Sequence, residues 1–394
     1  MSVNTARNTI LKLVENSSIQ RRNFQFWDPN SKGHTHTLHN LINTNDAIRS
    51  EIANYFINEF SNKNEIVLDP FCGAGTVPLE AAVNSRVPYY SDVDPFLLSL
   101  ASAKLQPADI TEVTLFLQQI NLKKPISTTH YQQYFSEFYD IDTFKEIVNL
   151  KKHLLSTYDN TARFVEVLAL SLLHGNNAGY FSTFTNPNFS LSPEEQRDFN
   201  IQRKQRPEYR PVTPRLLKKT AFVTSDGITS SHLKVVESST VKRADARNLN
   251  YLKNQSIDLI LTSPPLPNSG YNPTSYWLKH WFSDINPSDF ANSLTQTADL
   301  TEWLDFMNEC LMEFARVLNF GKFATLHIRD IYINNKIINL SEDFVRMVKE
   351  ELAAFWSVEY IYTNDLPNIQ LNVLRPRENT SRSLVDRVVV LKRK

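Results

Sequence analysis

The chain has 394 residues, of which 41% are hydrophobic, and its 42 basic side chains balance 42 acidic ones. This length predicts one large domain with an insertion or two modest domains, and no apolar run reaches the roughly 18 residues of a membrane span. Because Cys72 and Cys310 are the only cysteines, neither a disulfide framework nor a cysteine-based zinc site is possible, and we expect a cytoplasmic protein without a metal.

The first part of the chain alternates strands and helices. The spacing of apolar residues predicts a helix over residues 45–60, capped by Asn45 or Asp46. Further on, we expect strands over 65–69 and 87–92 and helices over 77–84 and 95–104. This alternation is typical of a parallel sheet with crossover helices.

The alternation stops between residues 106 and 230. A strongly apolar helix is expected over 162–173, followed by a long polar loop over 174–193. Ser192 and Glu195 have the spacing of a capping box at the start of the next helix. We therefore divide the chain into a first half (1–105), a largely helical insertion (106–230) and a second half (231–394).

The sheet pattern is expected to resume near residues 234–237. A strand-to-turn segment at 245–249 and a strand at 258–261 follow. The remaining predictions are a helix over 300–318, a turn at 320–322, a strand over 323–328, a helix over 340–355 and a closing antiparallel strand pair at 358–362 and 387–391.

The first functional motif follows the strand at 65–69. It reads Asp69-Pro70-Phe71-Cys72-Gly73-Ala74-Gly75-Thr76. A glycine turn between a strand and a helix lets the backbone approach a ligand closely, although Gly-x-Gly alone lacks the third glycine of a dinucleotide fingerprint. An ordinary strand-to-helix turn is the alternative.

The second motif, Thr262-Ser263-Pro264-Pro265, ends the strand at 258–261. Two prolines preset the backbone angles and remove competing donors, so a side-chain oxygen and a backbone carbonyl are held in a fixed geometry. Such acceptors suit an exocyclic amine, which must be oriented because its lone pair is drawn into the ring.

Together the two motifs resemble the cofactor loop and the catalytic loop of the DNA amino-methyltransferases of restriction–modification systems. The resemblance implies an α/β fold: a seven-stranded, mostly parallel sheet with helices on both faces, interrupted here by the helical insertion. It also implies S-adenosylmethionine as the cofactor, bound mainly by the first half, and catalysis in the second half.

The resemblance assigns cofactor contacts to three further positions. His36 corresponds to the N-terminal cofactor motif, Asp92 to the acid that accepts the ribose hydroxyls, and Asp245 to the acid that meets the adenine amino group. Asp94 is the alternative to Asp92. The cofactor-binding set is thus His36, Asp69, Pro70, Phe71, Gly73, Gly75, Thr76, Asp92 and Asp245.

The catalytic set implied by the resemblance is Ser263, Pro264, Pro265 and Leu266. Serine at the first position is associated mainly with N4 of cytosine, and Asp or Asn with N6 of adenine, so N4-cytosine is the favoured target and N6-adenine the alternative. Leu266 stands where the family normally has an aromatic residue that stacks on the base. Tyr271 or Tyr276 can substitute for it; otherwise a non-catalytic protein that binds cofactor or DNA is the alternative.

The insertion is the expected DNA-reading region, because no other segment leaves room for one. A base in duplex DNA must leave the stack to reach such a pocket. The basic run is expected to contact phosphates and consists of Arg203, Lys204, Arg206, Arg210, Lys218 and Lys219, with a solvated face as the alternative. Duplex DNA with a specific target site, and a cognate restriction endonuclease, are the expected partners.

Overall fold

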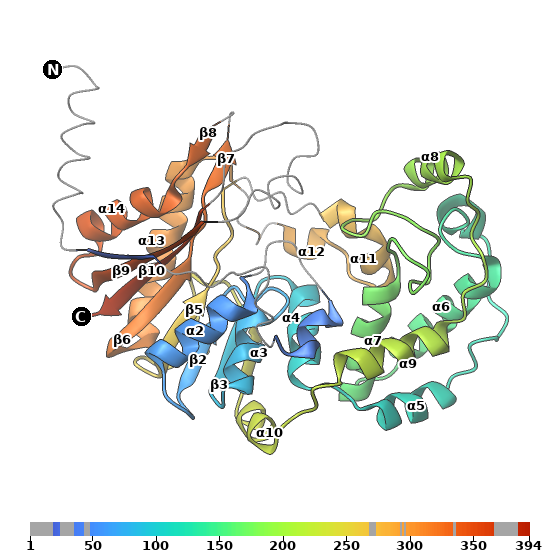
Figure 1. Cartoon of the computed structure of the whole chain (residues 1–394), viewed down its shortest axis with the longest axis horizontal. Helices are drawn as coiled ribbons and strands as arrows, with labels where there is room; N and C mark the ends of the chain where they lie inside the picture. The colour runs from blue at the N-terminus through green and yellow to red at the C-terminus, as the bar shows by residue number, and fades with distance from the viewer. Residues whose placement is uncertain are drawn as a thin grey trace.

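The protein consists of an α/β half built on one large sheet, beside a half that is almost entirely helical (Figure 1). This computed structural model describes residues 19–23, 35–42, 48–267, 273–291, 294, 297–333, 336–365 and 385–394. Among these residues, none of the helices is long and apolar enough to cross a lipid bilayer.

The large sheet has the strand order β1-β9-β10-β6-β5-β2-β3-β4. Its strands are β1 (Gln20–Asn23), β2 (Ile66–Asp69), β3 (Val87–Asp92), β4 (Thr240–Arg243), β5 (Ile257–Thr262), β6 (Leu318–His327), β9 (Trp356–Asp365) and β10 (Val385–Arg393), and β7 (Ile331–Ile333) pairs with β8 (Lys336–Ile338) in a separate ribbon. Strand β10 is antiparallel to both neighbours, and the other pairs are parallel. The predicted mostly parallel sheet and its closing antiparallel pair are confirmed, and β1 adds an eighth strand along β9.

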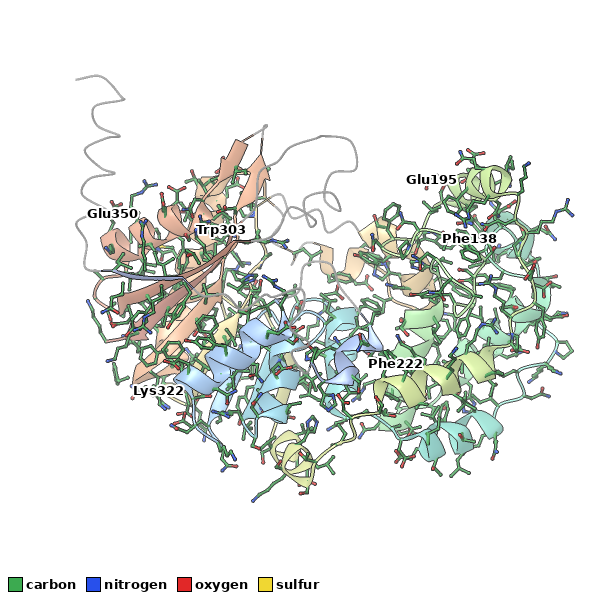
Figure 2. All side chains as sticks on the ribbon, in the orientation of Figure 1. Phe138, Glu195, Phe222, Trp303, Lys322 and Glu350 are labelled. Carbon is green, nitrogen blue, oxygen red and sulfur yellow. The ribbon has the colours of Figure 1, made fainter. Side chains whose placement is uncertain are left out.

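Helices cover both faces of the sheet because its central strands carry buried apolar residues on both faces. In β5, Leu259 and Leu261 pack with residues of α2 and α3, whereas Ile260 packs with residues of α13 and α14 on the opposite face. Trp303 of α13 is 1% exposed and anchors that second layer (Figure 2).

The helices fall into two groups. Those of the sheet half are η1 (Thr37–Leu41), α2 (Ser50–Phe60), α3 (Thr76–Val83), α4 (Pro95–Leu105), α10 (Ser230–Glu237), α13 (Leu300–Val317) and α14 (Leu340–Glu351). Those of the helical region are α5 (Ile110–Gln118), η2 (Tyr131–Phe135), α6 (Ile141–Leu154), α7 (Asn160–Leu172), α8 (Pro193–Arg203), α9 (Val212–Val223), η3 (Pro273–Tyr276), α11 (Trp277–Ser283) and α12 (Ser288–Ala291).

The helical region shares a hydrophobic core with the first crossover helices. Phe164 of α7, together with Phe138, belongs to the same buried cluster as Leu100 of α4. Helix α8 begins at the capping box that the sequence predicts: the Ser192 hydroxyl accepts from the Glu195 amide, and the Glu195 carboxylate accepts from the Ser192 amide.

Two sequence-based element predictions are wrong. The segment 234–237 is not a strand but the end of α10, where the Thr229 hydroxyl caps the helix by accepting from the His232 amide and Val235 and Val236 are buried. The expected turn at 320–322 lies inside β6, where Gly321 has φ +75° and the register with β5 shifts. The predicted helix at 45–60 is confirmed from Ser50 onward, and its predicted caps Asn45 and Asp46 lie outside the described residues.

Arg210 holds the long loop after α7 in place rather than facing solvent. It is 6% exposed, and its guanidinium donates to the backbone carbonyls of Ser182, Tyr180 and Asn177. Burial lowers the pKa of Arg210. The expectation that Arg210 contacts DNA is therefore corrected: its donors are used inside the protein.

The turn between β2 and α3 requires glycine at two positions for different reasons. Gly75 caps α3 with φ +79°, and a Cβ there would lie 2.7 Å from the Cα and Cβ of Ala101 on α4. Gly73 has φ +49°, but a Cβ there would meet no atom within 4 Å. Position 75 thus requires glycine because of both packing and backbone conformation, whereas position 73 requires it because of backbone conformation alone.

We expect Gly75→Ala to lower the free energy of unfolding by about 3 kcal/mol, because left-handed strain and overpacking against α4 add together. Gly73→Ala is the matched control and should cost about 1 kcal/mol, from strain alone. Urea unfolding monitored by circular dichroism measures both. Equal losses for the two variants would show that contact with Ala101 does not matter.

Arg210→Ala is expected to destabilise the protein by about 2 kcal/mol, because it leaves buried carbonyl oxygens without donors. Arg206→Ala, at an exposed position of the same basic run, should change the stability by less than about 0.5 kcal/mol. The thermal midpoint compares the two, and a similar midpoint for both variants would contradict the structural role of Arg210.

Candidate functional site

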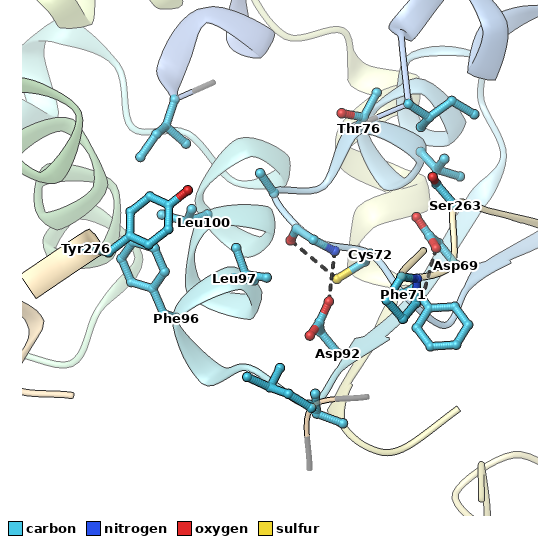
Figure 3. Close-up of a pocket in the computed structure, with 18 of the residues that line it drawn as sticks. Asp69, Phe71, Cys72, Thr76, Asp92, Phe96, Leu97, Leu100, Ser263 and Tyr276 are labelled. Carbon is cyan, nitrogen blue, oxygen red and sulfur yellow. Dashed lines mark hydrogen bonds between the residues drawn. The ribbon is translucent and has the colours of Figure 1, made fainter. Parts of the chain in front are cut away.

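A cavity of about 430 Å³ opens where β2, β3 and β5 end, between the sheet and the helical region (Figure 3). One wall comes from the sheet and includes Asp69, Asp92 and Ser263. The other comes from the helical region and includes His174, Tyr180, Asn188, Lys219, Tyr276 and Lys279. We call these the sheet wall and the helical wall. Open sheets bind ligands at this edge, beyond the carboxyl ends of their strands.

Asp69, the last residue of β2, ties the two motifs together. Its Oδ1 accepts a hydrogen bond from the Thr262 hydroxyl at 2.6 Å and another from the Phe71 amide at 3.2 Å. Burial raises the pKa of Asp69 to about 7, and the charge of Asp92 adds to the rise. The carboxylate thus stands at the base of both the cofactor loop and the Ser263 loop.

Asp92 ends β3 and holds the cofactor loop from the other side. Its carboxylate accepts from the Gly73 amide and from the Asp94 amide, each at 3.0 Å. Burial raises the pKa of Asp92 to about 6. Asp94, the alternative candidate, is fully buried, caps α4 by accepting from the Phe96 amide and does not line the cavity. The geometry therefore favours Asp92 as the ligand-facing acid.

The Ser263 loop is braced by neighbours on β6 and α13. The Ser263 hydroxyl lies 3.3 Å from Nδ1 of His327, the last residue of β6, and Trp303 Nε1 donates to the Pro265 carbonyl at 2.7 Å. Leu266 is partly buried and packs against the core cluster that contains Trp303. All four predicted catalytic residues, Ser263, Pro264, Pro265 and Leu266, line the cavity.

Most of the predicted cofactor residues also line the cavity. These are Asp69, Pro70, Phe71, Gly73, Thr76, Asp92 and Asp245. Asp245 forms an ion pair with Arg247, with 2.7 Å between Oδ2 and the guanidinium. Burial alone would raise the pKa of Asp245, but the hydrogen bonds and charge of Arg247 outweigh it, and the pKa is lowered. Gly75 lies behind the loop against α4, as its packing requires.

His36 does not line the cavity, contrary to the sequence-based expectation. Its Nδ1 accepts from the Leu38 amide at the start of η1, and its Nε2 lies 3.1 Å from the Gly227 carbonyl oxygen. The N-terminal segment instead contributes Asn40, Leu41 and Ile42, which lie further along the chain than the motif indicates.

The sequence assigned only part of the helical wall to the site, namely Lys219 and the segment that begins at Tyr276. Tyr276 was a candidate aromatic, and Figure 3 draws it on the same side of the view as Phe96, away from Ser263 and Asp69. Tyr271, the other candidate, lies outside the described residues. His174, Asn188 and Lys279 belong to no local sequence motif, because segments that are distant in sequence bring them together. The sequence signal that pointed to this wall was the polar and aromatic composition of residues 174–191 and 276–282.

The basic run splits into three environments. Arg203, Lys204, Arg206 and Lys218 are exposed and stay predicted phosphate contacts. Arg203 also lies over the Phe184 ring, 5.1 Å from its centroid. Arg210 is buried, as described above. Lys219 donates to the Asn40 carbonyl at 2.7 Å and lines the cavity, so it stays a predicted phosphate contact, but inside the cavity and apart from the exposed members of the run.

Comparison with known proteins gives one family model and a set of distant structural similarities. The family model, described as "UPF0020: RMKL-like, methyltransferase domain", matches residues 41–165. No curated protein sequence matches the chain.

The similar solved structures have low sequence identity. TrmN from Thermus thermophilus is 12% identical with a TM-score of 0.33, and the match covers 88% of this chain and 49% of that one, so this chain spans about half of TrmN. A putative rRNA-methylase from Clostridium thermocellum is 8% identical (TM-score 0.36; 88% and 100% covered). A putative DNA modification methylase from Thermus thermophilus is 16% identical (TM-score 0.24; 38% and 51% covered).

The family-model match spans the cofactor loop and both acids that end β2 and β3. The sheet order and the cavity at the carboxyl ends of these strands agree with it. Residues 41–165 thus match a methyltransferase domain, and the fold around them is consistent with that match.

Proposed function

We propose that this protein is a site-specific DNA methyltransferase that moves a methyl group from S-adenosylmethionine to N4 of cytosine, and that it protects DNA from a cognate restriction endonuclease. The observation that supports the proposal most is the Ser263-Pro264-Pro265 loop at the end of β5, in the same cavity as the cofactor loop. The 2.6 Å hydrogen bond between Thr262 and Asp69 fixes the two loops relative to each other.

The residues of the sheet wall fit the proposed cofactor. Open space beside Gly73 leaves room for a ligand against the loop backbone. Asp69 and Asp92 offer negative charge to a cationic ligand and acceptors to ribose hydroxyls. When bound, S-adenosylmethionine supplies an electrophilic methyl group on a sulfonium.

Ser263 would orient the amine of the target base. When His327 is protonated on Nε2, its Nδ1 accepts from the Ser263 hydroxyl, so the lone pairs on Oγ point toward the cavity as acceptors. An N–H donated to Oγ turns the amino nitrogen out of its planar conjugation and aims it at the methyl group. The indole of Trp303 holds the Pro265 carbonyl, so the loop keeps this geometry without reorganisation.

Leu266 gives the pocket an aliphatic surface where the resembling enzymes have an aromatic ring. Base–aromatic stacking is worth about 1–3 kcal/mol per base, so this chain must obtain part of its base affinity elsewhere. Tyr276 on the helical wall is an aromatic side chain of the same cavity.

The proposal is tested by mass spectrometry of nucleosides from plasmid DNA and total RNA of cells that express the chain. We expect N4-methylcytosine in the DNA, and about a hundredfold less methylation by purified Ser263→Ala, because a preorganised hydrogen bond to the reacting group is lost. Thermal shift with S-adenosylmethionine serves as the control and should be unchanged in this variant.

Each other outcome has its own meaning. N6-methyladenine would overturn the base assignment, and modified RNA nucleosides with unmodified DNA would overturn the DNA assignment. No modified base in either nucleic acid would indicate a non-catalytic cofactor-binding or DNA-binding protein.

Cofactor binding should depend on pH through Asp69 and Asp92. Their pKa values of about 7 and 6 lie above the usual value of 3.8 for an aspartate. The unliganded protein therefore loses stability as the pH rises from that usual value to about 7. A cationic cofactor favours the charged carboxylates and offsets that loss. The thermal shift caused by S-adenosylmethionine should therefore be larger at about pH 8 than at about pH 5.5.

Asp92→Asn should bind more weakly and flatten this dependence, because the variant keeps an acceptor but loses the titrating charge. Differential scanning fluorimetry at both pH values measures the effect. If the cofactor caused the same thermal shift in the wild-type protein at both pH values, Asp69 and Asp92 would not contact the cofactor.

A further inference from the structure

The two walls of the cavity carry charges of opposite sign. Three acids, Asp69, Asp92 and Asp245, lie on the sheet wall, whereas the charged side chains of the helical wall are Lys219 and Lys279. Arg329, which follows β6, adds a further cation to the cavity. An acidic wall suits a cationic cofactor, and a basic wall opposite to it suits an anion.

We infer that Lys279 binds a backbone phosphate of the nucleic-acid strand whose base enters the cavity. This inference rests on the proposed function, since it takes the second substrate to be a nucleic acid. It makes Lys279 a positioning residue for that strand, on the wall opposite the cofactor.

Lys279 is a partly buried cation without an acid beside it. It lies on α11 and lines the cavity, and among the described residues no carboxylate pairs with it and no hydrogen bond to its ammonium is found. Its ammonium lies 5.3 Å from the centroid of the Tyr276 ring. Burial lowers the pKa of Lys279 to about 8, which reflects the energetic cost of a charge without an anionic partner.

The neighbouring basic groups of this wall do not offer a free charge. Lys219 donates to the Asn40 carbonyl at 2.7 Å. Burial, with the nearby charge of Lys279, lowers the pKa of His174 to about 3, so this ring is neutral. Its Nδ1 lies 3.1 Å from the Asn186 carbonyl oxygen and its Nε2 lies 3.3 Å from the Ser190 hydroxyl.

Hydrogen bonds hold the segment that carries Lys279 to the rest of the helical region. The Ser275 carbonyl accepts from the Ser190 amide at 2.7 Å, Trp277 Nε1 donates to the Leu191 carbonyl at 2.8 Å, and Lys151 Nζ donates to the Trp281 carbonyl at 2.6 Å. A cation on so fixed a helix is preorganised for its ligand, which lowers the entropic cost of binding.

The carboxylate of the cofactor is the competing anion. The acids and the glycine turn that would hold the cofactor lie on the sheet wall, and Figure 3 shows Tyr276, whose ring the Lys279 ammonium approaches, on the other side with Phe96. A strand that enters between the walls presents its phosphates to the helical wall while its base turns toward Ser263.

Lys279 is one of several titratable groups around α11 and the cavity. The helix packs on α7, where burial raises the pKa of Glu166, with Ser283, Arg163 and Lys151 acting to lower it. The other titratable or charged groups that face this segment or line the cavity beside it are His174, Tyr180, Tyr276, His280, Asp284, Lys219, Arg329, Cys72, Asp69, Asp92 and Asp245. Loss of the Lys279 proton above about pH 8 should therefore weaken phosphate binding.

The test uses the purified full chain and a fluorescein-labelled oligodeoxycytidine strand, which presents unpaired nucleotides whatever the recognition sequence is. Fluorescence anisotropy across a salt series gives the affinity and its salt dependence. Lys279→Met should raise the Kd about tenfold and reduce the slope of log Kd against log salt by about 0.7, the value for one phosphate on a single strand. The cofactor Kd from calorimetry should not change.

Two further variants sharpen the test. Lys279→Arg keeps its charge at high pH, so it should retain affinity and abolish the decline of wild-type affinity above about pH 8. Lys253→Met removes an exposed lysine of the segment between β4 and β5 and should leave both Kd values unchanged.

An unchanged strand Kd and salt slope in Lys279→Met would overturn the inference. A weaker cofactor Kd with an unchanged strand Kd would do so as well, by assigning Lys279 to the cofactor carboxylate. Failure of the proposed function would look different: the wild-type chain would leave no N4-methylcytosine in DNA, while the salt slope, which requires no methyl transfer, would still report on Lys279.

Discussion

The site depends on one buried hydrogen bond, from the Thr262 hydroxyl to the Asp69 carboxylate at 2.6 Å. It joins the ends of two adjacent parallel strands, β2 and β5, at the point where each leaves the sheet for a functional loop. Both partners are almost fully buried, so the bond is strong, and its loss would take one of two donors, the other being the Phe71 amide, from a carboxylate in a low-dielectric setting. The relative position of the two motifs is therefore set by the sheet and not by the loops.

A second clamp, from Asp92 to the Gly73 amide, fixes the loop on its other side. The two carboxylates thus have a structural role: each accepts backbone or side-chain donors, and burial raises the pKa of each. A cationic ligand beside them would favour their charged forms.

The local parts of the fold were predictable because local rules decide them. The Ser192 capping box, the β2–glycine–α3 turn and the strand Val87–Asp92 all follow from spacing and composition. The strand predicted at residues 234–237 was wrong because Val235 and Val236 suit a strand as well as a helix. The Thr229 cap and the burial of both valines favour the helix. The internal contacts of His36, Arg210 and Lys219 were not predictable, because their partners, Gly227, Ser182 and Asn40, are remote in sequence. Most of the helical wall was missed for the same reason.

Helix α11 follows the catalytic loop in sequence, yet its hydrogen bonds tie it to α6 and to the loop before α8. The surface that faces the sheet across the cavity is therefore assembled from two separate stretches, 106–230 and 273–291. If residues 106–230 alone were replaced by those of a related chain, the hydrogen bonds donated by Ser190, Trp277 and Lys151 between the two stretches would be lost. A chimaera that keeps these contacts needs both stretches from one parent, so this half of the molecule is a structural module built from two separate parts of the sequence.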